Sequence, residues 1–154
     1  MRAWLLAAFV SMPLPVFALD IDGKIDSTEW SGAQRIDDFR MTQPLTREPS
    51  RHTTETWYMA TADGRAIAFR NLQPADVPRT RQRFQRDSNG NVDRVNVDFD
   101  GDDRSDYNFM VTLSDDIADS TISNETQFNH DWDGNWSHAV SEDENGWSSE
   151  LLIP

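Results

Sequence analysis

The sequence predicts an all-β domain, an antiparallel β-sandwich of the immunoglobulin-like or jelly-roll-like kind. Three observations carry this prediction. Several short segments are rich in Val, Thr and aromatic residues, apolar side chains occupy alternate positions within them, and turn-forming residues separate them. Short strands at regular spacing are typical of sandwiches and barrels, and 154 residues are enough for one such domain.

The N-terminal end differs from the rest of the chain. A basic start, Met1-Arg2, precedes the apolar stretch Ala3–Val10 and two prolines, an order that is typical of a cleavable export signal. A membrane anchor is the alternative, but this stretch is too short to cross ~30 Å of hydrocarbon, and the prolines interrupt a helix. We therefore expect residues 1–18 to be a signal peptide cleaved after Ala18, and residues 19–154 to be the mature domain.

The expected elements follow one another with turns between them. A short helix is expected at Ser27–Ala33, where the Ser27 side chain could cap the first turn. Turns at Ala62–Arg65 and Glu142–Gly146 join the first two and the last two strands, and the stretches 44–50 and 74–80 are expected as loops. Alternating side chains predict strands at Thr54–Ala60, Ala66–Arg70, Arg94–Phe99, Tyr107–Leu113, Trp136–Val140 and Gly146–Ile153.

The aromatic side chains divide into two groups. Five lie on alternating faces of predicted strands and are expected in the core: Trp57, Phe69, Phe99, Phe109 and Trp147. Trp132 and Trp136 instead lie in a polar stretch with Asp131. A sugar has an apolar face and polar edges, so aromatic rings flanked by Asp and Asn predict sugar binding by Trp132, Trp136 and Asp131. The alternative is that Trp136 closes one end of the sandwich.

Acidic residues are concentrated in the second half of the chain. The sequence has 27 acidic and 14 basic residues, a net charge of −13 and no cysteine. Residues 19–86 carry 10 acidic and 11 basic residues, whereas residues 87–154 carry 17 and 2. Such a protein is repelled by the phosphates of nucleic acid, and without cysteine it forms neither disulfides nor thiolate metal sites. The local excess of acid indicates either a solvated face or a cation-binding one.

Three acidic turns share the pattern D-x-[DN]-G-[DN]: 87–91, 98–102 and 131–135. Alternate oxygen-bearing side chains around a glycine turn suit Ca²⁺, which takes six to eight oxygen ligands. Simple turn chemistry is the alternative reading, and none of the three matches an EF-hand. The second turn is the richest in carboxylates and predicts a calcium site made by Asp98, Asp100, Asp102, Asp103 and Asp106.

No catalytic pattern stands out. His52, His130 and His138 lack metalloprotease spacing, and the chain contains no G-x-S-x-G. Paired carboxylates for glycoside hydrolysis are conceivable in so acidic a chain, but no feature of the sequence singles out a pair. We therefore expect this domain not to be an enzyme.

Four blocks of sequence resemble family 9 carbohydrate-binding modules. They are the opening run Ile21–Asp26 followed by Trp30, then Asp93–Asp100, Tyr107–Val111 and Gly146–Pro154. The match is most similar to a subgroup in which the module stands at the N-terminus of a large exported bacterial protein with a C-terminal outer-membrane β-barrel region.

The resemblance implies a β-sandwich that binds sugar ends and carries structural calcium. Characterised sugar binders of the family have a Glu where this chain has Asn96, and an Arg where it has Met110. Asn96 is therefore added to the expected ligand-binding residues. In the family the closing strand continues past Ile153-Pro154, so the chain is expected to be a fragment truncated in or after its last strand.

The expected function is that of a non-catalytic carbohydrate-binding module of an exported protein, with calcium stabilising the fold. It would act in carbohydrate catabolism through an attached region, such as a glycoside hydrolase beyond residue 154. The alternative is a structural periplasmic N-terminal domain that continues into an outer-membrane β-barrel and has no sugar ligand. Either protein would be located in the periplasm, the outer membrane or the exterior of a Gram-negative bacterium.

Overall fold

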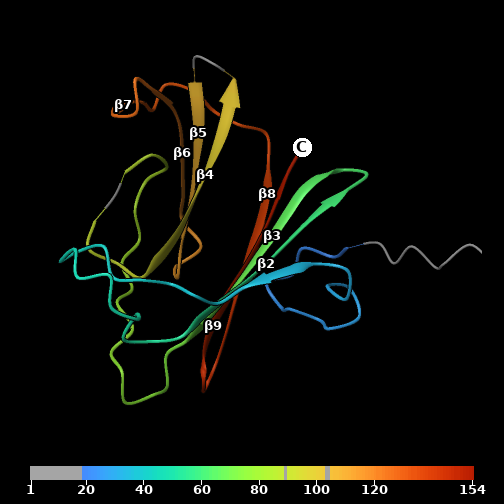
Figure 1. The fold of residues 1–154 in the computed structure, drawn as a ribbon, viewed down its shortest axis with the longest axis vertical. Helices are drawn as coiled ribbons and strands as arrows, with labels where there is room; N and C mark the ends of the chain where they lie inside the picture. Colours follow the sequence, from blue (N-terminus) through green and yellow to red (C-terminus); the bar gives the residue numbers. More distant parts are fainter. Residues whose placement is uncertain (1–18, 89, 103–104) are drawn as a thin grey trace, which may run out of the picture.

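The computed structural model describes residues 19–154 except for 89, 103 and 104. Within this part of the chain, nine strands form two antiparallel sheets packed against each other, and no residue is helical (Figure 1). The predicted all-β sandwich is confirmed. Among the described residues there is accordingly no helix that could span a membrane. The predicted signal peptide lies outside the described residues.

Each sheet combines strands from different parts of the chain. The five-stranded sheet has the order β1-β2-β3-β9-β8, and the four-stranded sheet has the order β4-β5-β6-β7. The chain therefore crosses between the sheets after β3 and again after β7. The strands are β1 (Gln34–Ile36), β2 (Thr54–Thr61), β3 (Gly64–Leu72), β4 (Arg94–Asp102), β5 (Ser105–Thr112), β6 (Ile117–Ser123), β7 (Gln127–Asn129), β8 (Ser137–Asp143) and β9 (Gly146–Ile153).

All six predicted strands are present, but β1, β6 and β7 were not expected. The centre of β6 is polar, and it escapes a search for alternating apolar residues although Asp119 and Ser120 are fully buried. The helix expected at Ser27–Ala33 is wrong, since this stretch forms turns. Asp26 rather than Ser27 supports them, through a 2.7 Å hydrogen bond from the Thr28 N–H to the Asp26 carboxylate, and one turn is too short to propagate as a helix.

The core lies between the facing sides of the two sheets. Buried side chains from β3, β4, β5 and β9 meet there, among them Ile67, Val95, Val111, Trp147 and Leu151. The core prediction is confirmed for Phe69, Phe109 and Trp147, which are at most 6% exposed. Phe99 is only partly buried at the edge of this core, and Trp57 packs in a second cluster with Trp30.

The second cluster is covered by an N-terminal segment, residues 19–33. This segment is fastened to β9 by the fully buried Glu150 carboxylate. Glu150 accepts hydrogen bonds from the Trp30 indole N–H (2.9 Å) and from the backbone N–H groups of Gly23 (2.8 Å) and Asp22 (3.0 Å). Burial raises the pKa of Glu150, while these hydrogen bonds act in the opposite direction. These hydrogen bonds join the opening block of the sequence (Ile21–Asp26 and Trp30) to the closing block (Gly146–Pro154) in the folded protein.

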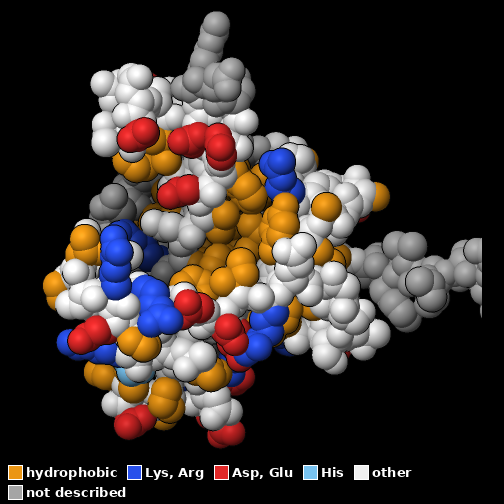
Figure 2. Space-filling view, viewed as in Figure 1, with side chains coloured by type: hydrophobic (Ala, Val, Ile, Leu, Met, Phe, Trp, Pro, Cys, Tyr) orange, Lys and Arg blue, Asp and Glu red, His pale blue; other side chains and the backbone are white. Residues whose placement is uncertain are grey.

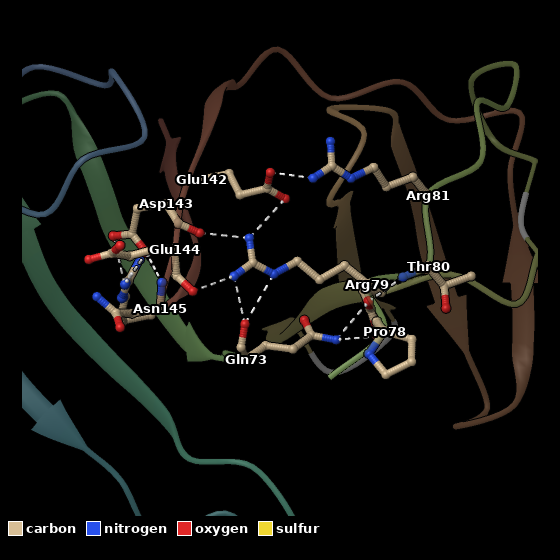
Figure 3. Close-up of polar contacts among 11 residues, drawn as sticks. Gln73, Pro78, Arg79, Thr80, Arg81, Glu142, Asp143, Glu144 and Asn145 are labelled. Atoms are coloured by element: carbon tan, nitrogen blue, oxygen red, sulfur yellow. Dashed lines mark hydrogen bonds and ion pairs between the residues drawn. The ribbon is translucent and has the colours of Figure 1, made fainter. Parts of the chain in front are cut away.

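A crossing segment, residues 73–93, connects the two sheets and carries four arginines. Arg79 donates to the carbonyl oxygens of Gln73 (2.6 Å) and Asp143 (2.7 Å) at the β8–β9 turn (Figure 3). Arg81 pairs with Glu142 on β8, as the same figure shows. The basic and acidic halves of the sequence are therefore partly neutralised against each other in the folded protein.

Candidate ligand-binding cleft

The two sheets leave a small cleft between them at one end. Its volume is about 270 Å³, close to the lower end of the range for small-molecule sites (~300–1,000 Å³). Figure 2 shows hydrophobic side chains gathered in a hollow of the surface, with charged side chains around it. The cleft is lined by the aromatic and basic side chains of Arg65, Phe99, Tyr107, Phe109, Trp132 and Trp136.

The neighbouring strands β4 and β5 supply three of the aromatic rings. The register places Phe99 opposite Tyr107 and Val97 opposite Phe109, so these residues share the face of the sheet that points into the sandwich. The Phe99 and Phe109 rings meet edge to face, with centroids 6.0 Å apart. This ladder of rings forms one wall of the cleft.

A tryptophan segment, residues 130–136, connects β7 to β8 and brings two indoles to the same rings. Trp132 packs against Tyr107 at 5.0 Å and against Phe109 at 6.0 Å between ring centroids. Trp136 meets Phe109 edge to face at 5.3 Å. Both indoles are only partly buried, so the fold holds them by packing and still leaves part of each exposed.

Asp119 on β6 fixes the tryptophan segment. Its carboxylate is fully buried and accepts hydrogen bonds from the Trp136 indole N–H (3.0 Å) and the Gly134 N–H (2.7 Å). A Cβ at Gly134 would lie 2.9 Å from the Trp132 ring and 3.1 Å from an Asp119 oxygen, so a side chain here would push both neighbours away. The acidic turn 131–135 is therefore hydrogen-bonded to a buried carboxylate.

Arg86 of the crossing segment balances the charge at Asp119. Its guanidinium donates to both Asp119 oxygens at 2.7 and 3.0 Å and pairs with Asp133 at 2.7 Å. Carboxylate oxygens of Asp87, Asp119 and Asp133 lie within 4.8 Å of one another, a spacing that a cation could bridge. The first and third acidic turns thus meet here, but Arg86 already supplies the positive charge.

Of the predicted calcium residues, Asp98, Asp100 and Asp102 lie on β4 and Asp106 lies on β5. Asp98 accepts a 2.6 Å hydrogen bond from the Asn108 side chain, Asp100 is exposed and Asp106 is partly buried. The side chain of Asp102 and the whole of Asp103 lie outside the described residues. The calcium site therefore stays a prediction.

Two of the four predicted sugar-binding residues line the cleft. Trp132 and Trp136 do so, whereas Asp131 is exposed. Asn96 pairs with Met110 in the β4–β5 register and alternates with Val95, so it lies on the outer face of the sheet. Arg65 and Tyr107 also line the cleft. No local pattern in the sequence indicates them, because only the pairing of distant strands brings them to the tryptophan segment.

A larger groove, of about 480 Å³, lies between the crossing segment, β8 and the β5–β6 turn. Its charged side chains are already paired with one another or with neighbours: Arg81 with Glu142, Arg83 with Asp116, and Asp115 with His138. The aromatic cleft keeps more of its binding groups available and is the stronger candidate.

Comparison with protein-family models, with curated proteins and with solved structures finds no match to this chain.

Proposed function

We propose that this domain is a non-catalytic carbohydrate-binding module whose aromatic cleft receives one sugar unit. One observation carries the proposal: the fold brings Trp132 and Trp136, two tryptophans from a polar segment, to a small cleft with three further aromatic rings. Apolar ring faces beside polar groups suit the mixed surface of a sugar. The resemblance to family 9 modules supports the same function.

The cleft is organised before any ligand binds. Asp119 accepts hydrogen bonds from the Trp136 indole and the Gly134 backbone. The Phe109 ring packs edge to face against the indoles of Trp132 and Trp136. A preformed site costs less conformational entropy on binding than one assembled by the ligand. Asn96 and Met110, where the family's sugar binders carry a Glu and an Arg, lie on the outer face of the sheet and do not line this cleft, so the cleft is proposed on its own contacts.

Glycan binding by the Trp132→Ala variant tests the proposal. We expect the wild-type protein to bind a subset of glycans in array and calorimetric measurements, and Trp132→Ala to bind them at least about tenfold more weakly, a loss of ~1.4 kcal/mol. Leu45→Ala is the control, because Leu45 is an exposed apolar residue outside the cleft and the tryptophan segment. Unchanged binding by Trp132→Ala would place the sugar elsewhere, and a folded protein that binds no glycan would refute the function.

The rival function is a structural periplasmic domain of an outer-membrane β-barrel protein, with no sugar ligand. The packing of Trp136 on Phe109 and its bond to Asp119 favour it, since a purely structural tryptophan would make the same contacts. The glycan measurements discriminate between the two, because the rival predicts a stable fold without glycan binding. The carbohydrate-binding proposal includes export to the periplasm or beyond. It also includes a role in carbohydrate catabolism through an attached region.

Calcium belongs to this proposal as a stabilising ion of the β4–β5 hairpin. The density of carboxylates over residues 98–106 supports it, because a divalent cation would relieve their mutual repulsion. The ion is assigned to the fold and not to sugar binding, since none of Asp98, Asp100 and Asp106 is among the described residues that line the cleft.

A further inference from the structure

The charge of the cleft is opposite to the charge of the protein. Among the side chains of the described residues that line it, that of Arg65 is the only charged one. The whole chain, by contrast, has a net charge of −13. An arginine on an aromatic wall therefore gives this site a specific preference that the stacking residues do not give.

Arg65 is an exposed residue whose guanidinium contacts the aromatic wall of the cleft. It lies near the start of β3, opposite Ile153 of β9, and its guanidinium carbon lies 5.3 Å from the centre of the Phe99 ring. Among the described residues it makes no ion pair. Arg86, in comparison, is bound to Asp119 and Asp133.

We propose that the cleft selects an acidic sugar, a uronic acid unit whose carboxylate binds Arg65 while its ring packs against the tryptophans. This inference rests on the proposed carbohydrate-binding function and names the class of sugar. A guanidinium stacked on an aromatic ring keeps the N–H groups at its edge free. These groups match a carboxylate in a two-pronged contact, which is stronger and more directional than a neutral hydrogen bond.

The surroundings make this contact selective. The apolar rings exclude water from one side of the guanidinium, and partial exclusion of water strengthens a charge pair. The acidic surface elsewhere repels anions at long range. An anionic sugar therefore gains affinity only where its carboxylate touches Arg65.

Calorimetric titration with matched pairs of ligands tests the inference. The probes are oligogalacturonates and oligoglucuronates, each compared with its methyl ester, which keeps the sugar but removes the charge. We expect the free acid to bind at least about tenfold more tightly than its ester, as for loss of a charge-assisted hydrogen bond. Arg65→Met should abolish this difference, whereas the control Arg51→Met, which removes an equal charge from an exposed position outside the cleft, should keep it.

The outcomes separate this inference from the function on which it rests. Equal binding of acid and ester, or tighter binding of neutral glycans, would overturn the acidic preference and leave a carbohydrate-binding module. A preference for the acid that survives in Arg65→Met would overturn the assignment to Arg65. A folded protein that binds no sugar of either kind would remove the proposed function as well. If Arg65→Met does not fold, Arg65→Gln gives the same readout.

Discussion

Two buried carboxylates, one in each sheet, do the same structural task. Glu150 and Asp119 are both fully buried, and each accepts a tryptophan indole N–H and a glycine backbone N–H. Glu150 fastens the N-terminal segment to the five-stranded sheet, and Asp119 fastens the tryptophan segment to the four-stranded sheet. They differ in charge balance, since Asp119 pairs with Arg86 and Glu150 has no basic partner among the described residues.

The two carboxylates show two ways of compensating a charge in the protein interior. A buried charge is costly unless it is paired or fully hydrogen-bonded. Glu150 relies on three N–H donors, and burial raises its pKa. Asp119 has two such donors and a cation from the crossing segment. Removing Glu150 should therefore lower the free energy of unfolding by loosening the N-terminal segment. Removing the partner of Asp119 should lower it less and should also disturb the tryptophan segment.

The largest effect is expected for Glu150→Ala. This change leaves the Trp30 indole N–H and the Gly23 N–H buried without acceptors, each at a cost of ~1–3 kcal/mol, and also removes the acceptor of the partly buried Asp22 N–H. We expect the free energy of unfolding to fall by about 4 kcal/mol in urea denaturation. Glu144→Ala, at an exposed position of the β8–β9 turn, should change it by less than ~0.5 kcal/mol. A loss for Glu150→Ala as small as that of the control would show that the N-terminal segment is not fastened by this carboxylate.

Arg86→Met should have a smaller but still clear effect. Removing one partner of a buried ion pair costs ~3–5 kcal/mol, and the partly exposed Arg86 side chain moves the expected loss to ~2–3 kcal/mol. Because Asp119 also holds Trp136, tryptophan fluorescence should change and glycan affinity should fall together with stability. Arg51→Met is the control, because Arg51 is exposed and has no carboxylate partner in the part of the chain that the structure describes. A loss of stability without any change at the tryptophans would separate Asp119 from the cleft.

Removal of calcium by a chelator should lower the stability of the protein modestly, without affecting the contacts of Glu150 and Asp119. If calcium binds the β4–β5 hairpin, EDTA removes about 1.4 kcal/mol of stability relative to a calcium concentration ten times the dissociation constant. The melting temperature should fall with EDTA and recover with Ca²⁺, and Asp106→Asn should weaken this response. A melting temperature that is indifferent to EDTA and Ca²⁺ would remove calcium from the proposal.

The sequence predicts those parts of the molecule whose pattern is local. Strands such as β3 and β9 are visible because their side chains alternate, and the tryptophan segment was identified because its indoles have polar neighbours. Strand β6 was not predicted, because the charge of Asp119 is balanced by Arg86, 33 residues earlier in the chain. No local pattern contains that pairing.

Arg65 was missed for the same reason. In the sequence it is the last residue of a predicted hairpin turn, and in the structure it remains exposed. It reaches the cleft because β3 pairs with β9 and because Phe99 comes from the other sheet. A binding site made from several strands depends on the order of the strands, which alternation of side chains does not specify.

The smallest effect concerns the protonation of Glu150. Burial raises the pKa of Glu150, so the folded protein holds this proton more tightly than the unfolded chain does. The stability that Glu150 contributes is therefore complete below the unfolded pKa (~4.3) and is lost as the pH rises through the folded pKa. Stability curves of wild type and Glu150→Gln between pH 4 and 7 isolate this contribution, because the other titrations cancel. We expect the advantage of the wild type over Glu150→Gln to shrink as the pH rises.

A pH-independent difference would contradict this expectation and change the comparison between the two carboxylates. It would mean that three N–H donors are enough to hold an ionised carboxylate in this interior. Asp119 has only two such donors, so Arg86 would still balance its charge, and the loss of stability expected for Arg86→Met would stay at ~2–3 kcal/mol.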